Sequence, residues 1–244
     1  MWALIPLKRY GQAKQRLSGF LMPGERISLL KAMLEDLLFV LCGHPEIESV
    51  LLVSDEPTVK KMALDKALEL ITEEELGVNG LNDVVQAAVS KLAQRGIDDV
   101  MVIHGDLPLL TEQEISILIK SHQQAKSPAV TIAQDIEGQG SNCVLCTPAS
   151  QMHFQYGVNS LQKHRVHAQE ISASLQIINL PGAQCDIDTP VDLIKLVNHP
   201  LLVKASQTKR YLDESGIAEF IRNIPAESLA PLSLCATVNY QQLD

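Results

Sequence analysis

The chain is poor in cysteine, has no long apolar run and carries fewer positive than negative charges. Its 5 cysteines are an odd and low number for 244 residues, which argues against a disulfide scaffold. No apolar stretch approaches the roughly 20 residues that a transmembrane helix needs. The apolar stretch within residues 1–9 precedes its charges, whereas a secretory signal begins with charge. We therefore expect a cytoplasmic protein with no membrane partner.

The shortage of positive charge limits the class of ligand. Lys and Arg number 20 and Asp and Glu number 29, so the net charge is −9. Such a surface repels nucleic acid, whose binding needs basic patches. A small anion can bind only where the few cations gather on one site. Hydrophobic residues make up 46% of the chain and charged residues 20%, which excludes a mostly disordered chain.

Short apolar segments alternate with amphipathic ones along the chain. The segments typical of strands are residues 2–6, 49–54, 68–71, 100–103, 129–133, 142–146 and 175–180. Helical spacing or capping signals mark residues 23–41, 81–95, 111–124, part of 158–170, and 190–197. This order predicts an α/β fold with a mostly parallel sheet, mixed in its second half and covered by helices on both faces. We expect one domain over residues 1–198, and an extension over 199–244 with one or two helices within 204–223.

The loop after the first predicted strand is rich in cations, and three of them are candidates for binding phosphate: Lys8, Lys14 and Arg16. Ligands of open α/β sheets bind beyond the carboxyl ends of the strands, so this loop can wrap phosphate groups. A solvated basic loop is the alternative interpretation. The loop has only one early glycine, Gly11, so it is neither a P-loop nor a dinucleotide-binding fingerprint.

Acidic residues stand in two further places where chemistry is expected. Asp106 comes soon after the apolar segment 100–103, and a single carboxylate there can hold Mg²⁺ together with phosphate oxygens and water. Asp186 and Asp188 lie two residues apart, so in an extended segment their carboxylates point the same way and call for a cation. The alternatives are a turn acid at Asp106 and a helix cap at Asp188. His104 is expected to be a packed or hydrogen-bonding residue rather than a metal ligand.

Two other motifs carry weaker signals. Glycine-rich turns at residues 138–142 and 154–160 expose backbone N–H groups that favour an anion, although most glycines only make turns. Cys143 and Cys146 have a CxxC spacing. On a strand, positions three apart face opposite sides, so we do not expect a zinc or redox site there.

Taken together and in order, seven segments resemble the guanylyltransferases that begin assembly of the deazaflavin coenzyme F420, which are related to the molybdenum-cofactor guanylyltransferases. The segments are IPLKRYGQAKQRL, MPGERISLLKAMLEDLL, LLVSDEP, GLNDVVQAA, VIHGDLPLLT, GQGSN and CDIDTPVDL, within residues 1–197. The resemblance implies a Rossmann-like nucleotidyltransferase fold with a central mixed sheet. It also implies Mg²⁺-dependent transfer of GMP from GTP to 2-phospho-L-lactate, phosphoenolpyruvate or 3-phospho-D-glycerate, with release of pyrophosphate.

The resemblance assigns expected roles to single positions. Catalytic phosphate contacts fall to Lys8, Lys14 and Arg16, and metal binding to Asp106, Asp186 and Asp188. Nucleotide binding falls to Pro6, Leu7, Lys8, Asp55, Gly80, Leu81 and Asn82, with no particular contact assigned to Asp55. Binding of the phosphorylated acceptor falls to Gly140, Ser141, Asn142 and Ser160.

Two departures from the family pattern touch the acceptor side. Gln139 stands in a turn where the family usually has three consecutive glycines and Thr, and residues 156–161 replace a segment of the FGPGSF type. Three alternatives therefore stay open: nucleotidyl transfer to molybdopterin or a sugar phosphate, a GTP-binding protein without catalysis, and a plain α/β binding domain whose acids are caps. The extension after residue 198 is expected to cover the core or to form a homodimer contact.

Overall fold

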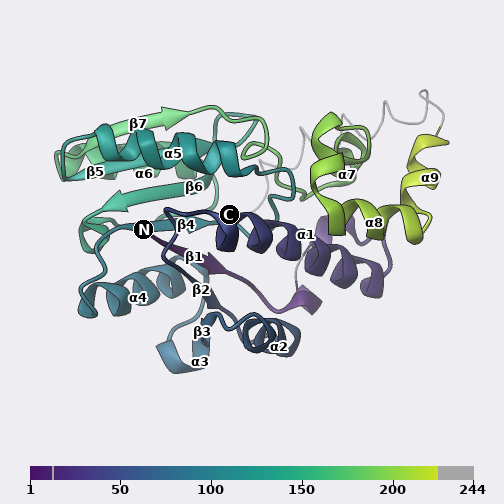
Figure 1. Ribbon diagram of the computed structural model, residues 1–244, viewed down its shortest axis with the longest axis horizontal. Coiled ribbons are helices and arrows are strands. Elements are labelled where there is room, and N and C mark those ends of the chain that lie inside the picture. Colours follow the sequence, from purple (N-terminus) through teal and green to yellow (C-terminus); the bar gives the residue numbers. More distant parts are fainter. Residues whose placement is uncertain (13, 225–244) are drawn as a thin grey trace.

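A computed structural model describes residues 1–12 and 14–224 and has a seven-stranded mixed sheet at its centre (Figure 1). The strand order is β3-β2-β1-β4-β6-β5-β7. The strands are β1 (Trp2–Pro6), β2 (Ser49–Val53), β3 (Glu69–Ile71), β4 (Val100–Ile103), β5 (Ala129–Gln134), β6 (Ser141–Thr147) and β7 (Ser174–Ile178). All seven predicted strands are confirmed, and the Rossmann-like α/β class with them.

The sheet is mixed because of one strand. β6 runs antiparallel to both of its neighbours, β4 and β5, while every other pair is parallel. The predicted mixing in the second half of the sheet is therefore confirmed. The central strands β1 and β4 are buried on both faces, as parallel strands between two helical layers are.

Helices cover both faces of the sheet. On one face, α1 (Pro23–Gly43) and α5 (Glu112–Gln124) pack against alternate residues of β1 and β4, such as Ile5 and Ile103. On the other face, α4 (Leu81–Gln94) and α6 (Ser160–Glu170) pack against the residues between them. Cys143 and Cys146 lie in the cores on opposite faces of the sheet, as their spacing on a strand predicts. Both are free thiols.

Local capping explains where several helices begin. Thr111 and Glu114 form a capping box at the start of α5, and Thr189 and Asp192 form another before α7 (Pro190–Val197). Two helices were not predicted, α2 (Pro57–Asp65) and the single turn α3 (Glu73–Leu76). α2 is short and opens with Pro57 at its first position, a start signal that the sequence does contain.

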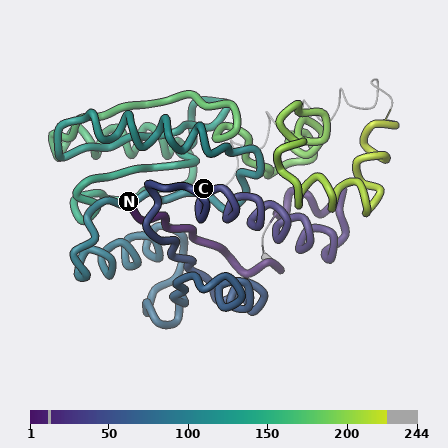
Figure 2. Tube along the Cα trace, viewed as in Figure 1, coloured from purple at the N-terminus to yellow at the C-terminus, as the bar shows by residue number. Residues whose placement is uncertain are grey.

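The described part of the C-terminal extension packs against α1. After a 3₁₀ turn over Pro200–Lys204 come α8 (Ser206–Glu214) and α9 (Ile217–Arg222), which confirms two helices in this stretch. Figure 2 shows these late helices, in yellow-green, beside the dark blue of α1. The phenol of Tyr211 donates a hydrogen bond to the carbonyl of Glu25 at 3.0 Å.

Two expectations about this extension go untested. The domain boundary after residue 198 and the homodimer contact stay predictions, and residues 225–244 of the predicted extension lie outside the described residues. Among the described helices, none is long and apolar enough to cross a membrane.

Candidate functional site

The site residues gather at one edge of the sheet because of the strand directions. β1, β2, β3, β4, β5 and β7 share one direction, so their carboxyl ends lie at a common edge, where the antiparallel β6 begins. The loop after β1, the turn after β4 and the segment before α7 all meet there. This arrangement brings together residues that are far apart in the sequence.

Lys14 lies at the centre of this edge. Its Nζ contacts the carboxylate of Asp106, and it donates a hydrogen bond to Oδ1 of Asp188 at 2.6 Å. Only 6% of the Lys14 side chain is exposed, compared with 47% of the Asp188 side chain. The structure thus joins three residues that the sequence analysis placed in separate motifs.

The charges of this cluster depend on one another. Burial alone lowers the pKa of Lys14, but the carboxylates of Asp106 and Asp188 outweigh it and raise that pKa above its ordinary value. Burial alone raises the pKa of Asp106, whereas the Lys14 ammonium more than offsets it, so the pKa of Asp106 is lowered. Both groups are therefore charged at neutral pH. Oδ1 of Asp106 is buried and accepts no hydrogen bond within the described part of the chain.

Among the three acidic residues, Asp186 is the one whose pKa is raised. Nδ2 of Asn142 donates hydrogen bonds to Oδ1 of Asp186 and to the carbonyl of Ala183, each at 3.0 Å. Burial first, and then the negative charges of Asp106 and Asp188, raise the pKa of Asp186 to about 7. An added cation would favour the ionised form of this carboxyl group.

The helix-cap alternative for Asp188 is not what the structure shows, and Asp106, although it lies in a turn, does not cap the helix that follows. The side chain of Thr189, not that of Asp188, caps α7, and the side chain of Thr111 caps α5. The carboxylates of Asp106 and Asp188 contact Lys14 instead. His104 packs its ring against Tyr156 at 5.1 Å between centroids, as expected of a packed residue, and its buried Nε2 has no described hydrogen-bond partner.

A groove runs from this cluster along the loop after β1. One cavity contains Lys8, Tyr10, Lys14, Asp106 and Asp188. An adjoining cavity contains Asp55, Gly80 and two residues that were not predicted, Arg9 and Glu73. The two cavities share four residues, which are Pro6, Leu7, Lys8 and Leu81. The predicted nucleotide-binding residues thus line one groove, apart from Asn82.

Asn82 has a different position. Its Oδ1 accepts a hydrogen bond from the backbone N–H of Tyr156 at 2.6 Å, and its Nδ2 donates to the carbonyl of the same residue at 3.4 Å. The amide therefore fixes the segment around Tyr156 against α4. It does not line either cavity of the groove.

The predicted acceptor residues form a buried network. Oγ of Ser160 accepts from the backbone N–H of Ser141, and Nδ1 of His164 lies 3.0 Å from Oγ of Ser141. Because Nε2 of His164 accepts from the N–H of Gln155 at 2.9 Å, Nδ1 carries the proton and donates to the Ser141 hydroxyl. Burial lowers the pKa of His164 to about 4, so its ring is neutral at pH 7.

The turn at Gln139 is organised by an acid that was not predicted. Oδ1 of Asp135 accepts from the backbone N–H of Gln139 at 2.8 Å. A Cβ at Gly140 would lie 2.6 Å from Oδ2 of the same carboxylate, so any other residue here would have to displace the side chain of Asp135. Gln139 is exposed, and the turn forms without the three consecutive glycines of the family pattern.

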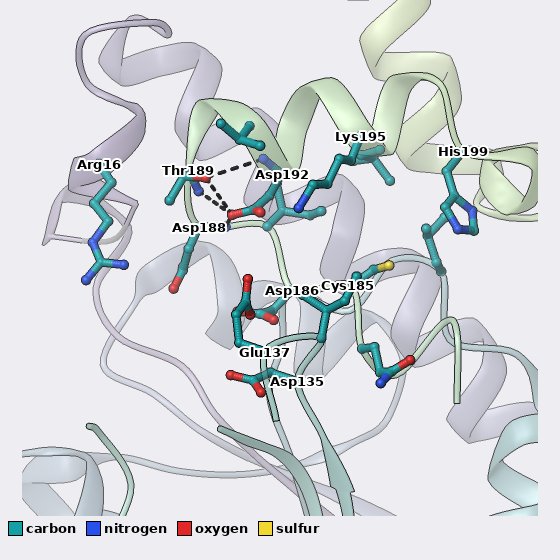
Figure 3. A pocket seen from close by; sticks show the side chains of 16 residues that line it. Arg16, Asp135, Glu137, Cys185, Asp186, Asp188, Thr189, Asp192, Lys195 and His199 are labelled. Carbon is teal, nitrogen blue, oxygen red and sulfur yellow. Dashed lines mark hydrogen bonds between the residues drawn. The ribbon is translucent and has the colours of Figure 1, made fainter. Parts of the chain in front are cut away.

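A third cavity is lined by Asp186 and by Asp188, which it shares with the groove (Figure 3). Arg16 contributes to its wall from the loop after β1, and Asp135 and Glu137 contribute from the turn after β5. Lys195 of α7 points into it. Sequence reasoning missed Lys195, because a lysine on an amphipathic helix normally faces solvent.

The acids fit a cation only in part. Among the described residues, no group of three or more His, Cys, Asp or Glu side chains is arranged to hold a metal ion. The ammonium of Lys14 lies between two of the three predicted ligands. The unpartnered oxygen of Asp106 and the raised pKa of Asp186 nevertheless fit a divalent cation, which needs only one or two carboxylates when phosphates complete its shell.

Comparison with known proteins places this chain in a family. The sequence pattern of the family described as "Guanylyl transferase CofC like" matches residues 1–226. A phosphoenolpyruvate guanylyltransferase of Sphaerobacter thermophilus is 29% identical over 88% of this chain and 98% of its own length. A 2-phospho-L-lactate guanylyltransferase of Methanothermobacter thermautotrophicus is 32% identical over 81% of this chain and 84% of its own.

Solved structures agree on the fold. A putative nucleotide-diphospho-sugar transferase from Desulfovibrio desulfuricans superimposes with a TM-score of 0.71 at 16% identity, covering 91% of this chain and 96% of that one. A 4-diphosphocytidyl-2C-methyl-D-erythritol synthase gives 0.57 at 14% identity, covering 82% and 98%. The fold is thus that of the Rossmann-like nucleotidyltransferases. The chain belongs to the CofC-like guanylyl transferase family and is an enzyme, a nucleotidyltransferase.

Proposed function

We propose that this enzyme transfers GMP from GTP to the phosphate of a small phospho-carboxylic acid and releases pyrophosphate. Relatives named for phosphoenolpyruvate and for 2-phospho-L-lactate support this class of acceptor, and 3-phospho-D-glycerate belongs to the same class. The family resemblance ties the reaction to coenzyme F420 biosynthesis. The observation that carries the proposal is the contact of Lys14 with Asp106 and Asp188 beside Asp186, at the edge where ligands of such sheets bind.

The reaction needs positioning more than acid–base chemistry. A phosphate oxygen of the acceptor attacks the α-phosphorus of GTP, and the bond from the α-phosphorus to the bridging oxygen of the β-phosphate breaks. A phosphate oxyanion is already a nucleophile at neutral pH, so no strong base is required. The barrier lies in bringing two polyanions together, which the enzyme lowers by orientation and by neutralising charge.

Lys8, Lys14 and Arg16 supply the protein's own positive charge. Lys8 and Lys14 line the groove together with Asp188, and Arg16 lines the third cavity, which also contains Asp188. In this proposal they donate hydrogen bonds to the triphosphate and to the departing pyrophosphate. The ammonium group of Lys14 already forms ion pairs with the two carboxylates of Asp106 and Asp188. When the triphosphate binds, the three N–H donors of this ammonium group must therefore be shared between the carboxylates and phosphate.

Asp106, Asp186 and Asp188 are the residues that would hold Mg²⁺. When bound, the ion neutralises phosphate charge and orients the two reacting groups. The pKa of Asp186, raised to about 7, leaves this carboxyl group partly protonated near neutral pH, and a bound cation would favour its ionised form. The network of Ser141, Ser160 and His164 fixes the backbone beside the acceptor.

A screen of acceptors tests the proposal. The protein is given GTP and Mg²⁺ with 2-phospho-L-lactate, phosphoenolpyruvate or 3-phospho-D-glycerate in parallel, and pyrophosphate release is measured. We expect release with at least one acid, and loss of at least about 100-fold in Asp106→Asn, because one charged metal-binding group is removed. Asp65→Asn, an exposed acid at the end of α2, is the matched control and should turn over normally.

The alternatives give other results in the same screen. Transfer to molybdopterin or to a sugar phosphate predicts release only with those acceptors, and the loop after β1 lacks the glycine-rich sequence common in those relatives. A non-catalytic GTP-binding protein predicts GTP binding with no release from any acceptor. Unchanged Mg²⁺-dependent release by Asp106→Asn would contradict the assignment of this carboxylate.

A further inference from the structure

The groove continues past Lys8 into a cavity that the phosphate-binding residues do not explain. Its walls come from the loop after β1, the loop after β2, α3 and the start of α4. Pro6, Leu81 and Val84 provide apolar surface, while Asp55 and Glu73 provide two carboxylates. A cavity with apolar walls and a few placed polar groups is the usual form of a small-molecule site.

The position of this cavity identifies which part of a nucleotide it would take. It shares Lys8 and Leu81 with the cavity that holds Lys14 and Asp106. A triphosphate held at the Lys14 end therefore directs its nucleoside toward Glu73. The apolar surface of Leu81 and Val84 suits the flat face of a base, and the carboxylates suit its edge.

Glu73 is not needed for the local structure. The start of α3 is capped by Thr72 and Glu75, whose hydroxyl and carboxylate each accept from the other's backbone N–H. Glu73 is partly buried, and the structure assigns its carboxylate no hydrogen bond within residues 1–12 and 14–224. Burial and then the charge of Asp55 raise the pKa of Glu73, while Arg9 and Lys8 act in the opposite direction.

The edge of guanine is chemically distinct among the bases. It presents two adjacent donors, N1–H and the exocyclic N2 amine, which one carboxylate can accept together. Adenine presents an acceptor at N1, and so does cytosine at N3. We propose that the carboxylate of Glu73 accepts hydrogen bonds from N1–H and N2–H of guanine and so selects GTP. This inference rests on the proposed function for its choice of a guanine nucleotide.

Inosine triphosphate is the sharpest probe, since it keeps N1–H and lacks the N2 amine. The affinities of the whole protein for GTP and ITP are measured by calorimetry with Mg²⁺ and without any acceptor. We expect the wild type to prefer GTP by about 10- to 100-fold, the ratio expected from one hydrogen bond to a charged group. In Glu73→Gln the side-chain NH₂ group faces one of the two N–H donors of guanine and cannot accept a hydrogen bond from it. The ratio of the affinities for GTP and ITP should therefore fall to within about threefold of unity.

The chain offers matched controls for this experiment. Glu74→Gln changes an exposed acid at the next position of α3, outside the cavity, and should keep the wild-type ratio. Asp55→Asn changes the other carboxylate of the cavity, and any change in affinity should apply to GTP and ITP alike, which leaves their ratio unchanged. Thermal unfolding of each variant confirms that it is folded.

Each outcome separates the two proposals. A wild type that binds GTP and ITP equally, a Glu73→Gln variant with the wild-type ratio, or a loss of the ratio in Asp55→Asn alone would overturn the assignment of Glu73. Selective GTP binding that depends on Glu73, without pyrophosphate release from any phospho-acid, would support the base contact and contradict the proposed transfer.

Discussion

At the scale of single residues, the site pairs one buried lysine with carboxylates of unequal character. Lys14 forms ion pairs with Asp106 and Asp188 and lowers the pKa of Asp106, whereas burial and the two acidic neighbours raise the pKa of Asp186 to about 7. Without a ligand, the carboxylates in such a site repel one another, and a bound cation or substrate complex reduces this repulsion. Active sites commonly lose stability in this way.

The raised pKa of Asp186 predicts a stability gain on its removal. The folded state holds this proton up to about pH 7, while the unfolded chain releases it near pH 4. Between these values the folded state binds more protons, so the contribution of Asp186 to stability falls as pH rises. We expect Asp186→Asn to be more stable than the wild type by about 2 kcal/mol at pH 8, and equal to it at pH 4.

Urea denaturation at the two pH values, without ligand, measures this difference. Asp65→Asn serves as the control, because its exposed side chain should show no pH-dependent gain. A variant at Asp186 that is less stable than the wild type at pH 8 would show that the carboxylate is compensated in the unliganded protein.

At the scale of elements, α1 caps a helix that lies far from it in the sequence. The N-cap residue of α8 is Ala205, whose side chain cannot accept a hydrogen bond. The carboxylate of Asp36 instead accepts from the backbone N–H groups of Gln207 and Thr208, at 3.0 and 2.8 Å. This contact fixes the extension on the core and satisfies donors that a helix start otherwise leaves unpaired.

Removal of this distant cap should destabilise the protein measurably. We expect Asp36→Ala to lower the free energy of unfolding by about 1–2 kcal/mol, the usual cost of a lost N-cap. Equilibrium urea unfolding measures it, with Glu35→Ala as the control, since within the described part of the chain the carboxylate of Glu35 makes one long contact, at 4.0 Å with Lys31. Equal losses in the two variants would argue against a capping role for Asp36.

The segment that carries Asp186 and Asp188 depends on a close approach at Gly182. Its N–H donates to Oε1 of Glu114 at 2.7 Å, and a Cβ at this position would lie 2.2 Å from the carbonyl oxygen of Leu109. Since that neighbour is backbone, it cannot move aside cheaply. The contact positions the acidic segment against the turn before α5.

We therefore expect Gly182→Ala to destabilise the protein by roughly 2–3 kcal/mol or more. Gly19→Ala is the matched control, because a Cβ there meets nothing within 4 Å. Thermal unfolding of the two variants distinguishes them. Equal melting temperatures would show that the backbone around Leu109 yields easily.

At the scale of the whole molecule, local patterns predicted the fold well. All seven strands and the helix starts at Thr111 and Thr189 follow from apolar runs and capping signals. The short turn α3 was missed because four residues show no helical period. The contact of Lys14 with Asp106 and Asp188 could not be predicted, because it spans 92 and 174 residues and depends on the packing of three loops.

The sequence indicates which residues lie near the site more readily than it indicates what each side chain contacts there. Ser141 and Ser160 were expected to face a ligand, yet their hydroxyls are buried and bond to the protein. Glu73 carries no motif and emerges only from the cavity that it lines. Sequence shows which residue types follow the strands, whereas side-chain direction depends on packing between distant segments.

The central claim is that GMP is transferred to a phospho-acid, and pyrophosphate release alone does not separate transfer from hydrolysis of GTP. The most direct test is ³¹P NMR of the protein with GTP, Mg²⁺ and the acid that gives release, confirmed by the mass of the product. The account predicts two coupled resonances of a new diphosphate bridge that joins guanosine to the acid, in amounts equal to the pyrophosphate. Free GMP with no such bridge would contradict it.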